Sequence, residues 1–385
     1  MDYGLTEEQQ MIRDVCRQLA EEKIKPVRAK YDEENEFPRE LLSAFAQSDI
    51  CGLYIEEQYG GLGGGVFDLV IAVEELSKVC GGIALMVAAT ALGIFPVILY
   101  GTDEQKKKYL PRIASGEALA AFALTEPNAG SDASAVATTA VKDGDSYVLN
   151  GTKQWITNGG EAEVYTVIAM TNKAKGARGA SAFIVEKGTP GFEFGKKEDK
   201  MGIRGSATRE LVFQDCRVPA ENLLGKEGQG FMVAMRTFDQ SRPGVAAQAL
   251  GIAAGALGEA VSYSRERRQF GKPICSFQGV QFMLADMATQ VEAARALVYE
   301  AARYIDGGAK KVSKISAMAK LFASDTAMRV TTDAVQILGG YGYMREYPVE
   351  KMMRDAKITQ IYEGTNQIQR EVIGLALIKE AAGRK

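Results

Sequence analysis

Apolar residues near the start of the chain recur every four positions, which is the spacing of an amphipathic helix. Met11, Val15 and Leu19 repeat at this period and would share one helical face. Thr6 and Gln9 stand just before them at the three-residue spacing of a capping box, in which two side chains satisfy the first free backbone N–H groups of a helix. The chain is therefore expected to open with an amphipathic helix.

A much more apolar pattern fills residues 67–101. Its sequence, FDLVIAVEELSKVCGGIALMVAATALGIFPVILYG, predicts helices buried on nearly all sides, with Gly81 and Gly82 as a break between two of them. Residues 102–116, TDEQKKKYLPRIASG, then predict a short surface helix. These patterns indicate an N-terminal all-α domain over residues 1–119.

From about Ala120 the hydrophobic period changes from four to two, and short β-rich runs appear. Asn150 and Gly151 form the dipeptide that a two-residue hairpin turn prefers, because both central residues of that turn need positive φ. A small antiparallel β domain over residues 120–226 is the simplest account. The β-rich runs are 146–156, 164–170, 181–187 and 210–218.

Long helical patterns return after the glycine-rich break at Gly228 and Gly230. Three or four of them, most about 20 residues or longer, predict an antiparallel bundle over residues 227–385. The segments with this pattern are 230–242, 245–268, 279–305 and 313–340. The expected fold class is thus multi-domain α+β, with a helical domain, a β domain and a helical bundle in that order.

Composition narrows the class of protein. Hydrophobic residues make up 46% of the 385 positions and charged residues 25%, as in soluble globular proteins, and no uninterrupted apolar run reaches 18 residues, so no membrane span is expected. A net charge of −3 argues against a nucleic-acid-binding protein, which usually carries a basic domain or stripe. The N-terminal residues MDYGLTEEQQMIRDV resemble neither a signal peptide nor a transit peptide, which favours a cytoplasmic protein or a mature chain.

The sequence contains no histidine, so mechanisms based on Ser-His-Asp, Cys-His or histidine-ligated metals are excluded. Proton abstraction near neutral pH must then use Asp, Glu, Lys, Tyr or Cys. The cysteines are far apart and form no C-x-x-C pair, which is typical of a reduced compartment. They are Cys16, Cys51, Cys80, Cys216 and Cys275.

Two segments of the β region could contact a ligand. In ALTEPNAGSD, residues 123–132, Gly130 would let the backbone approach a ligand while Thr125 and Ser131 offer hydroxyls to a polar ring or a pyrophosphate; a domain-crossing loop is the plainer interpretation. WITN, residues 155–158, contains the only tryptophan of the chain, which is either a core residue or a surface that stacks on an aromatic ring.

Four helical or loop segments admit a similar choice. The basic run 265–274 either complements a helix dipole or pairs with a phosphate. Gln336 to Tyr343, QILGGYGY, predicts a helix capped by glycines that would also allow close backbone approach. Asp239 and Arg242 would form a local ion pair. Glu363 lies in IYEGTNQIQR, where a solvated turn is the plain interpretation and a catalytic carboxylate the alternative.

Taken together, in this order and at these separations, the segments resemble the acyl-CoA dehydrogenase family over essentially the whole chain. The likeness is strongest in ALTEPNAGSD, NGTKQWITNG, GKKEDKMGIRGSATRELVFQDC, RRQFGKPI, DAVQILGGYGY and MRDAKITQIYEGTNQIQR, and it leans towards short-chain, butyryl-CoA-like members. The resemblance implies an N-terminal helical domain, a middle β domain and a C-terminal four-helix bundle, with FAD between the last two.

The resemblance also implies which residues bind FAD. Those that would hold the flavin ring are Phe122, Leu124, Thr125, Gly130, Ser131, Trp155, Ile156 and Thr157. Those that match the grip on the phosphates and adenosine are Arg267, Phe270, Gln278, Gln336, Ile337, Leu338, Gly339, Gly340, Thr365, Asn366 and Gln367. Some of these come from a neighbouring subunit in the family, which implies a homo-oligomer, usually a tetramer built as a dimer of dimers.

Glu363 matches the catalytic base of the family. The α-proton of an acyl thioester is weakly acidic, so its removal needs a positioned base, a donor to the thioester oxygen and a hydride acceptor at Cβ. In the family these are the glutamate, its own N–H together with a ribityl hydroxyl, and flavin N5. Some members carry the glutamate instead at the position of Ser241, where this chain has no carboxylate. Residues that match acyl-CoA contacts are Ser131, Asp239, Ser241, Arg242 and Gly364.

The function implied is FAD-dependent conversion of a short, possibly branched acyl-CoA to the trans-2-enoyl-CoA in fatty acid β-oxidation, with electrons passed to electron-transferring flavoprotein. Ala88, Ala89 and Ala91 would supply small side chains at the pocket floor. Ile83 stands where decarboxylating glutaryl-CoA dehydrogenases carry an arginine for the distal carboxylate, which argues against a dicarboxyl-CoA substrate. Three alternatives stay open: an enoyl-CoA reductase running the reverse reaction, a flavin oxidase or monooxygenase on this fold, and a flavin-free scaffold.

Overall fold

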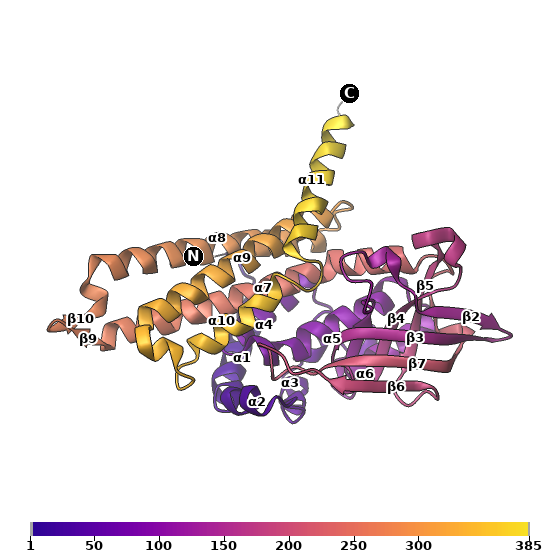
Figure 1. Cartoon of the computed structure of the whole chain (residues 1–385), viewed down its shortest axis with the longest axis horizontal. Helices are drawn as coiled ribbons and strands as arrows, with labels where there is room; N and C mark the ends of the chain where they lie inside the picture. Colours follow the sequence, from indigo (N-terminus) through magenta and orange to yellow (C-terminus); the bar gives the residue numbers. More distant parts are fainter. Residues whose placement is uncertain (1–2, 384–385) are drawn as a thin grey trace.

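The computed structural model describes residues 3–383 and shows three structural units in chain order. Helices come first, an antiparallel sheet follows, and a bundle of long helices completes the chain (Figure 1). The sheet lies at one end of the molecule and the bundle at the other, with the N-terminal helices packed between and below them (Figure 1). The fold class predicted from the sequence is confirmed.

The first helix, α1 (Glu7–Leu19), begins with the capping box that the sequence predicts. Gln9 N donates to Thr6 Oγ1 over 3.2 Å, and Thr6 N donates to Gln9 Oε1 over 3.1 Å. The same reciprocal pair between Thr102 and Gln105 starts the predicted helix α6. The N-terminal elements are α1, η1 (Ala20–Ile24), α2 (Arg28–Glu34), α3 (Leu41–Gln47), η2 (Ile50–Gly52), η3 (Glu57–Tyr59), α4 (Val66–Ser77), α5 (Gly81–Tyr100) and α6 (Asp103–Ala114).

Helix α5 forms the centre of the N-terminal unit, and its close contact with the sheet fixes one wall of the site described below. Gly93 makes this contact possible: a Cβ at this position would lie 2.4 Å from the backbone nitrogen of Ala121 in the first strand. Two helices among the described residues, Gly81–Tyr100 and Gly230–Glu266, are long and apolar enough to cross a membrane, with 78% and 67% of their most apolar windows buried inside the protein. Such burial is typical of core helices.

Eight strands within residues 3–383 form the main sheet, in the order β6-β7-β3-β2-β4-β5-β8, with β1 paired to β4. Most neighbours are antiparallel, as expected, but β1 and β2 each run parallel to β4. The strands are β1 (Ala120–Ala123), β2 (Thr139–Asp143), β3 (Ser146–Thr157), β4 (Val164–Met170), β5 (Ala180–Glu186), β6 (Phe192–Lys197), β7 (Thr208–Pro219) and β8 (Leu223–Leu224). The 3₁₀ turns in this region are η4 (Ala133–Ala135), η5 (Lys173–Gly179) and η6 (Ala220–Asn222).

The prediction of a hairpin turn at Asn150-Gly151 is wrong. Both residues lie inside β3, where the register against β7 shifts between Leu149 and Gly151, so the dipeptide makes a bulge. Gly151 has φ +147, and a Cβ there would lie 2.5 Å from the Thr138 hydroxyl oxygen, so this position also favours glycine. The β2–β3 hairpin instead turns at Gly144, whose φ is +60.

The C-terminal bundle packs α7 (Gly230–Glu266), α8 (Gln278–Asp306) and α9 (Ser313–Leu338) together, with the shorter α10 (Val349–Thr359) against α7 and α9. The two patterns predicted as separate helices before and after residue 243 form one helix, α7. Pro243 lies inside it and cannot donate to the carbonyl of Asp239 four residues earlier. Ser316 Oγ on α9 donates to that carbonyl over 2.8 Å, which explains how the helix continues through the proline.

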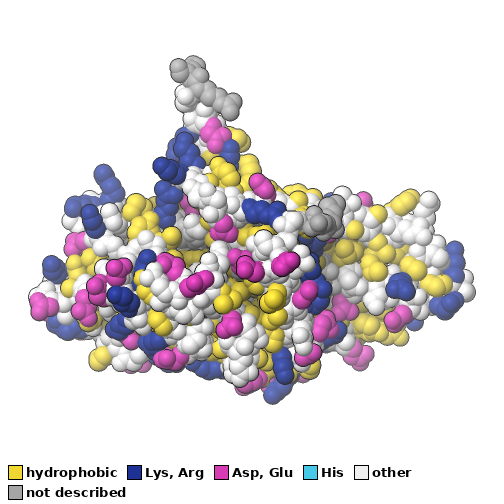
Figure 2. Space-filling view, turned by 180° about the vertical axis from the view of Figure 1, so that it is seen from behind, with side chains coloured by type: hydrophobic (Ala, Val, Ile, Leu, Met, Phe, Trp, Pro, Cys, Tyr) yellow, Lys and Arg dark blue, Asp and Glu magenta, His cyan; other side chains and the backbone are white. Residues whose placement is uncertain are grey.

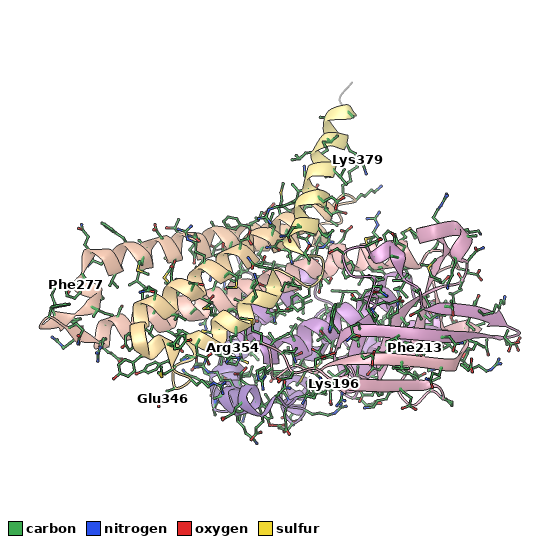
Figure 3. The ribbon with its side chains drawn as sticks, in the orientation of Figure 1. Lys196, Phe213, Phe277, Glu346, Arg354 and Lys379 are labelled. Atoms are coloured by element: carbon green, nitrogen blue, oxygen red, sulfur yellow. The ribbon has the colours of Figure 1, made fainter. Side chains whose placement is uncertain are left out.

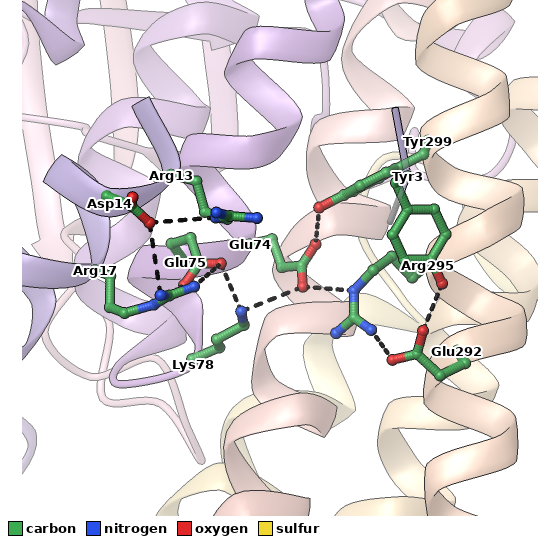
Figure 4. A network of polar contacts seen from close by, with 10 residues as sticks. All are labelled: Tyr3, Arg13, Asp14, Arg17, Glu74, Glu75, Lys78, Glu292, Arg295 and Tyr299. Carbon is green, nitrogen blue, oxygen red and sulfur yellow. Dashed lines mark hydrogen bonds and ion pairs between the residues drawn. The ribbon is translucent and has the colours of Figure 1, made fainter. Parts of the chain in front are cut away.

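Several polar contacts tie the N-terminal unit to the bundle, and two carboxylates, Asp306 and Glu74, accept those that hold α4. The carboxylate of Asp306, at the end of α8, accepts hydrogen bonds of 2.8 Å from the backbone N–H groups of Val66 and Phe67 and so caps α4 from 240 residues away. Glu74, buried on α4, accepts from Arg295 over 2.9 Å and from the Tyr299 hydroxyl over 2.8 Å (Figure 4). The beginning and the middle of α4 therefore depend on α8.

The last helix, α11 (Asn366–Ala382), begins in the bundle and then projects away from the body of the protein (Figure 1). Leu375, Leu377 and Ile378 on its projecting part are exposed. Figure 2 shows hydrophobic side chains beside basic ones on this projection. An exposed apolar helix face of this kind is typical of a contact with another chain.

Candidate active site

A cavity of about 480 Å³ lies between the sheet, α5, α7 and the loop before α11. It brings together residues from five separate segments of the sequence. The predicted site residues that line it are Phe122, Leu124, Thr125, Gly130, Ser131, Trp155, Ile156, Thr157, Ser241, Arg242, Glu363 and Gly364. The structure therefore gathers the residues predicted for the flavin ring, the catalytic base and most of the acyl-CoA contacts in one place.

The sheet presents Trp155 to the cavity through an irregular backbone. The register of β3 against β7 shifts between Lys153 and Ile156, and Trp155 at that shift has φ +57, a conformation that non-glycine residues rarely adopt. The indole is 59% exposed, whereas Ile156 beside it is buried. A large aromatic face left exposed at a strained position is typical of a ligand-binding wall.

A buried ion pair holds the neighbouring loop, residues 124–131, in place. Lys153 Nζ, fully buried, donates to Glu126 Oε1 over 2.7 Å and to the carbonyl of Leu124 over 3.0 Å. The Glu126 carboxylate also accepts from the backbone N–H groups of Ala137 and Thr138. Burial lowers the pKa of Lys153 to about 8. The loop is thus fixed from beneath.

The surface of this cavity fits a planar conjugated ring with polar edges. Trp155 and Phe122 supply aromatic walls, and Thr125, Ser131 and Thr157 supply hydroxyls. A Cβ built on Gly130 would meet no atom within 4 Å, so space remains in front of the backbone there. Aromatic faces with a few hydroxyls between them are typical of sites for small organic ligands. Among the described residues no group of three His, Cys, Asp or Glu side chains could hold a metal ion.

Glu363 lies in the loop between α10 and α11, in a left-handed conformation with φ +51, followed by Gly364 with φ +88. Thr365 then caps α11 by accepting a hydrogen bond from the N–H of Ile368. The sharp turn directs the carboxylate towards α7, where Ser241 Oγ donates to Glu363 Oε2 over 2.6 Å. The solvated turn considered from the sequence is therefore not what the structure shows.

The backbone around Glu363 is held by three side chains. The carbonyl of Glu363 accepts from Arg242 Nε over 3.4 Å and from Gln369 Nε2 over 3.1 Å. The carbonyl of Gly364 accepts from Gln369 Nε2 and from Lys320 Nζ, both over 2.8 Å. Within residues 3–383, the N–H of Glu363 donates to no acceptor, so a donor stays available beside the carboxylate.

Burial raises the pKa of Glu363 to about 7, and the Ser241 hydrogen bond and the charges of Arg242 and Lys320 oppose this rise. Burial also lowers the pKa of Lys320 to about 7 and lowers the pKa of Arg242. A carboxyl group with a pKa near the working pH is suited to accept a proton, because it is available as a base and still basic enough to react.

Small and apolar side chains of α5 form another wall of the cavity. Leu85, Ala88, Ala89 and Leu92 line the cavity, and the sequence correctly places Ala88 and Ala89 there. Ala91 is part of the main core instead, because it lies on another face of the helix. This apolar wall lies beside Glu363 and suits a hydrocarbon chain.

Asp239, predicted to contact substrate, lies behind Arg242 within the bundle. Its carboxylate accepts from Ser313 Oγ over 2.6 Å and lies 3.7 Å from the Arg242 guanidinium, as the predicted ion pair requires. Burial raises the pKa of Asp239. Its contact with the cavity is made through Arg242.

A second cavity, of about 520 Å³, lies at the far end of the bundle and is lined by five of the eleven residues predicted for the phosphates and adenosine. Arg267 lies 5.3 Å from the centre of the Tyr341 ring. The cavity lies among four short elements: the hairpin strands β9 (Arg268–Gln269) and β10 (Lys272–Pro273), and the turns η7 (Ile274–Ser276) and η8 (Gly339–Tyr343). The predicted residues that line it are Arg267, Ile337, Leu338, Gly339 and Gly340.

The two cavities lie far apart. Arg242 and Arg267 are 25 positions apart on or at the end of α7, which corresponds to roughly 37 Å along a helix axis. Phe277, beside the second cavity, lies at one end of the molecule and Phe213 of the sheet at the other (Figure 3). One ligand cannot contact both cavities of a single chain at this distance.

Six predicted cofactor residues line neither cavity. Phe270 is 94% exposed at the tip of the β9–β10 hairpin, and Gln278, Gln336 and Gln367 are exposed. Thr365 serves as the cap of α11. Asn366 is buried, and its side chain contacts Lys320, Ser324 and Asp325.

Four residues that support the site were missed by the sequence analysis: Lys153, Glu126, Lys320 and Gln369. A pattern in the sequence could have indicated Lys320. Ser313, Ser316, Lys320 and Ser324 recur every three or four positions on α9, so polar side chains share one face of a helix that must be buried in a bundle. Buried polar groups need partners, and this face meets Asp239 and the loop of Glu363.

Family models match nearly the whole chain. The N-terminal domain of acyl-CoA dehydrogenase matches residues 6–117, its middle domain residues 121–216 and its C-terminal domain residues 228–378. The solved structure of butyryl-CoA dehydrogenase from Megasphaera elsdenii is 54% identical, with a TM-score of 0.96, and the match covers 98% of this chain and 100% of that one.

Two further relatives bear on function. Acryloyl-CoA reductase (NADH) from Anaerotignum propionicum is 53% identical over 98% of this chain and 96% of its own length. A chain in a structure described as electron transferring flavoprotein of Acidaminococcus fermentans, studied for flavin-based electron bifurcation, is 57% identical with a TM-score of 0.96, covering 98% of this chain and 99% of that one.

Proposed function

This chain belongs to the acyl-CoA dehydrogenase family, and we propose that it oxidises a short-chain acyl-CoA, possibly branched, to the trans-2-enoyl-CoA. The observation that supports this most strongly is the Glu363 carboxyl group, which is half-buried beside an apolar wall, accepts a hydrogen bond from Ser241 and has a pKa raised to about 7. The family is a flavoprotein family, and we infer that the first cavity holds the ring of FAD.

Glu363 removes the α-proton of the thioester in this proposal. Its carboxylate lies between Ser241 and the cavity, and the Ser241 hydrogen bond holds one oxygen in place. An apolar acyl chain along Ala88, Ala89 and Leu92 excludes water from the carboxylate and raises its pKa further. The free N–H of Glu363 donates to the thioester oxygen as negative charge develops there.

FAD supplies a hydride acceptor when bound. Trp155 and Phe122 would enclose its ring, and Thr125, Ser131 and Thr157 would donate to or accept from its polar edges. The loop with Ser131 keeps its shape because the buried Lys153–Glu126 pair holds it. The protein thus places the base on one side of the acyl chain and the ring-binding wall on the other.

We infer that the second cavity serves a neighbouring subunit. Arg267 and Gly339–Gly340 would meet the phosphates and adenosine of an FAD whose ring lies in the first cavity of another chain, since roughly 37 Å separates the two cavities within one chain. The exposed Phe270 at the hairpin tip and the apolar side chains of α11 also favour contact between copies. A homotetramer, as the family resemblance implies, is the assembly we propose.

Replacing Arg267 with Ala tests this shared site. We expect the variant to lose most bound FAD in gel filtration although Arg267 lies far from the flavin ring. Arg265→Ala, which changes an exposed arginine two positions away, is the matched control and should retain FAD. An Arg267→Ala protein with wild-type FAD content would refute the assignment.

We propose electron-transferring flavoprotein as the electron acceptor, on the basis of the relative found in a structure of that name. The reverse reaction, reduction of an enoyl-CoA, is the second candidate, because a relative of similar identity is named acryloyl-CoA reductase. The residues of the site are the same for both directions. A flavin oxidase on this fold would differ in the rapid reoxidation of reduced flavin by air.

The direct test is an anaerobic panel of acyl-CoA and enoyl-CoA thioesters of increasing length and branching, with flavin absorbance as the readout. We expect butyryl-CoA to bleach the flavin of the wild type and crotonyl-CoA to recolour the reduced protein. Glu363→Gln should keep FAD and lose bleaching by at least a factor of about a thousand, because it removes the carboxylate that Ser241 holds beside the apolar wall. Rapid bleaching by Glu363→Gln would refute the base assignment.

A further inference from the structure

Lys320 is a cation buried beneath the loop of Glu363, and the chemistry described so far does not use it. It lies in the middle of α9 with no exposed surface. Its Nζ donates to the carbonyl of Gly364 over 2.8 Å and to Asn366 Oδ1 over 2.9 Å. Burying a lysine is costly unless its charge and its donors are satisfied, so a lysine at this position calls for an explanation.

We propose that Lys320 is a positioning residue for Glu363: its ammonium group holds the loop in its left-handed turn and, while it is protonated, supplies a positive charge behind the carboxylate. This inference rests on the proposed function, because it assumes that Glu363 is the base. Lys320 does not touch the cavity itself and acts through Gly364 and Asn366.

The hydrogen bonds around Asn366 make the loop rigid. Asn366 Oδ1 accepts from Lys320 and Ser324, while Asn366 Nδ2 donates to Ser324 Oγ over 2.9 Å and to Asp325 Oδ1 over 2.7 Å. The Asn366 N–H donates to the carbonyl of Gln360. The side chain that follows the turn is thus fully used in holding it against α9, and Lys320 connects it to the carbonyl of Gly364.

Lys320 contributes one of two buried positive charges near Glu363. The other, Arg242 on α7, lies 3.7 Å from Asp239 and is partly neutralised by it. The other charged groups that face the loop are Asp325 on α9, which pairs with Arg370 of α11, and Glu371 of α11 at the cavity wall. Asp355 on α10 lies near Tyr362, which precedes Glu363.

The positive charge of Lys320 lowers the pKa of Glu363 and so opposes the rise caused by burial. Removing the charge should leave Glu363 protonated over a wider pH range. The pH dependence of flavin reduction therefore distinguishes this role from simple packing, because a packing defect slows the reaction equally at every pH.

Lys320→Met is the first test, since it keeps most of the side-chain volume and removes both the charge and the donors. Lys320→Gln is the second test. Its side chain is neutral but retains an N–H donor for the buried acceptors, so this variant should disturb folding less than Lys320→Met. The FAD-bound proteins are mixed anaerobically with butyryl-CoA, and the rate of bleaching is followed from pH 5.5 to 9.5. We expect both variants to move the acid limb to higher pH, with rates about tenfold below the wild type near pH 6.5 for each pKa unit gained by Glu363.

Two further variants serve as controls. Gln369→Met removes the uncharged donor to the carbonyls of Glu363 and Gly364, and we expect a slower reaction with an unmoved acid limb. Lys314→Met removes a lysine from the same helix that pairs with Glu380 at the surface, and we expect wild-type behaviour. The KM for butyryl-CoA should change less than about twofold in both Lys320 variants, since Lys320 does not line the cavity.

Acid limbs that coincide with the wild type in both Lys320 variants would overturn this inference alone. Failure of both variants to fold or to bind FAD would assign Lys320 to the core instead of to positioning. A wild-type protein that no acyl-CoA bleaches would overturn the proposed function and this inference with it.

Discussion

Neutralising Glu363 should stabilise the protein at alkaline pH and have a much smaller effect at acid pH. Burial raises the pKa of this carboxyl group from its ordinary value of 4.5 to about 7. Between these two values the folded state holds a proton that the unfolded state has released. The stability of the wild type therefore falls as the pH rises from 4.5 through 7, because the folded protein must then hold the ionised carboxylate in a buried position.

The size of the effect follows from the two pKa values. A difference of about 2.5 at 1.36 kcal/mol per unit gives a ceiling of roughly 3.4 kcal/mol well above pH 7. At pH 5 the same linkage amounts to roughly 0.8 kcal/mol, since the unfolded state is then only partly ionised. Glutamine has no ionised form. The free energy of unfolding of Glu363→Gln, relative to that of the wild type, should therefore be roughly 2 to 3 kcal/mol larger at pH 8.5 than at pH 5.

Urea unfolding of the FAD-saturated proteins at pH 5 and pH 8.5, followed by circular dichroism, measures this difference. Glu371→Gln is the matched control, because Glu371 lines the same cavity and is exposed, and its variant should show no comparable change between the two pH values. Equal stabilisation of Glu363→Gln at both pH values would refute the argument that burial of an ionised carboxylate governs this site.

Three further predictions concern residues that hold the site in place. Ser241→Ala removes a hydrogen bond that lowers the pKa of Glu363, so the acid limb of flavin bleaching should move to higher pH in stopped-flow measurements; an unmoved limb would contradict this role. Gly93→Ala should destabilise the protein by roughly 2 kcal/mol or more in urea unfolding, because its Cβ would lie 2.4 Å from a backbone nitrogen of β1, and a neutral result would mean that α5 can move. Lys153→Met leaves Glu126 buried without its cation and should cost roughly 3 to 5 kcal/mol in the same assay, whereas a small loss would show that the carboxyl becomes protonated instead.

Much of the fold can be predicted from local patterns in the sequence. The capping box at Thr6 and Gln9 involves only neighbouring residues and appears in the structure as predicted. The prediction of a hairpin turn at Asn150-Gly151 was wrong because residues with positive φ occur both in hairpin turns and in β-bulges. Which of the two forms depends on the pairing with the neighbouring strand, which the local sequence does not contain. The helix through Pro243 could not be foreseen either, since Ser316, 73 positions later, satisfies the carbonyl that the proline leaves free.

Some residues of the candidate site could likewise be predicted from the sequence and others could not. Short motifs left Trp155 and Glu363 with a structural and a functional interpretation each, and only the family resemblance favoured the functional one; the structure brings both residues to one cavity. The supporting residues Lys153 and Lys320 act through contacts with carbonyls and carboxylates far away in sequence, so no local pattern identifies their partners. The distance between Arg267 and this cavity likewise depends on the length of α7. The sequence pattern predicted two helices in this region, so it did not indicate that distance.

The cap that Asp306 places on α4 has a consequence for how the protein is made. A ribosome adds about 5 to 20 residues per second, so roughly 10 to 50 seconds pass between the synthesis of Val66 and that of Asp306, 240 positions later. Throughout that interval the N–H groups of Val66 and Phe67 lack their native acceptor, and Glu74 lacks its partner Arg295. The first third of the polypeptide is thus synthesised before the residues that complete the contacts of α4 exist.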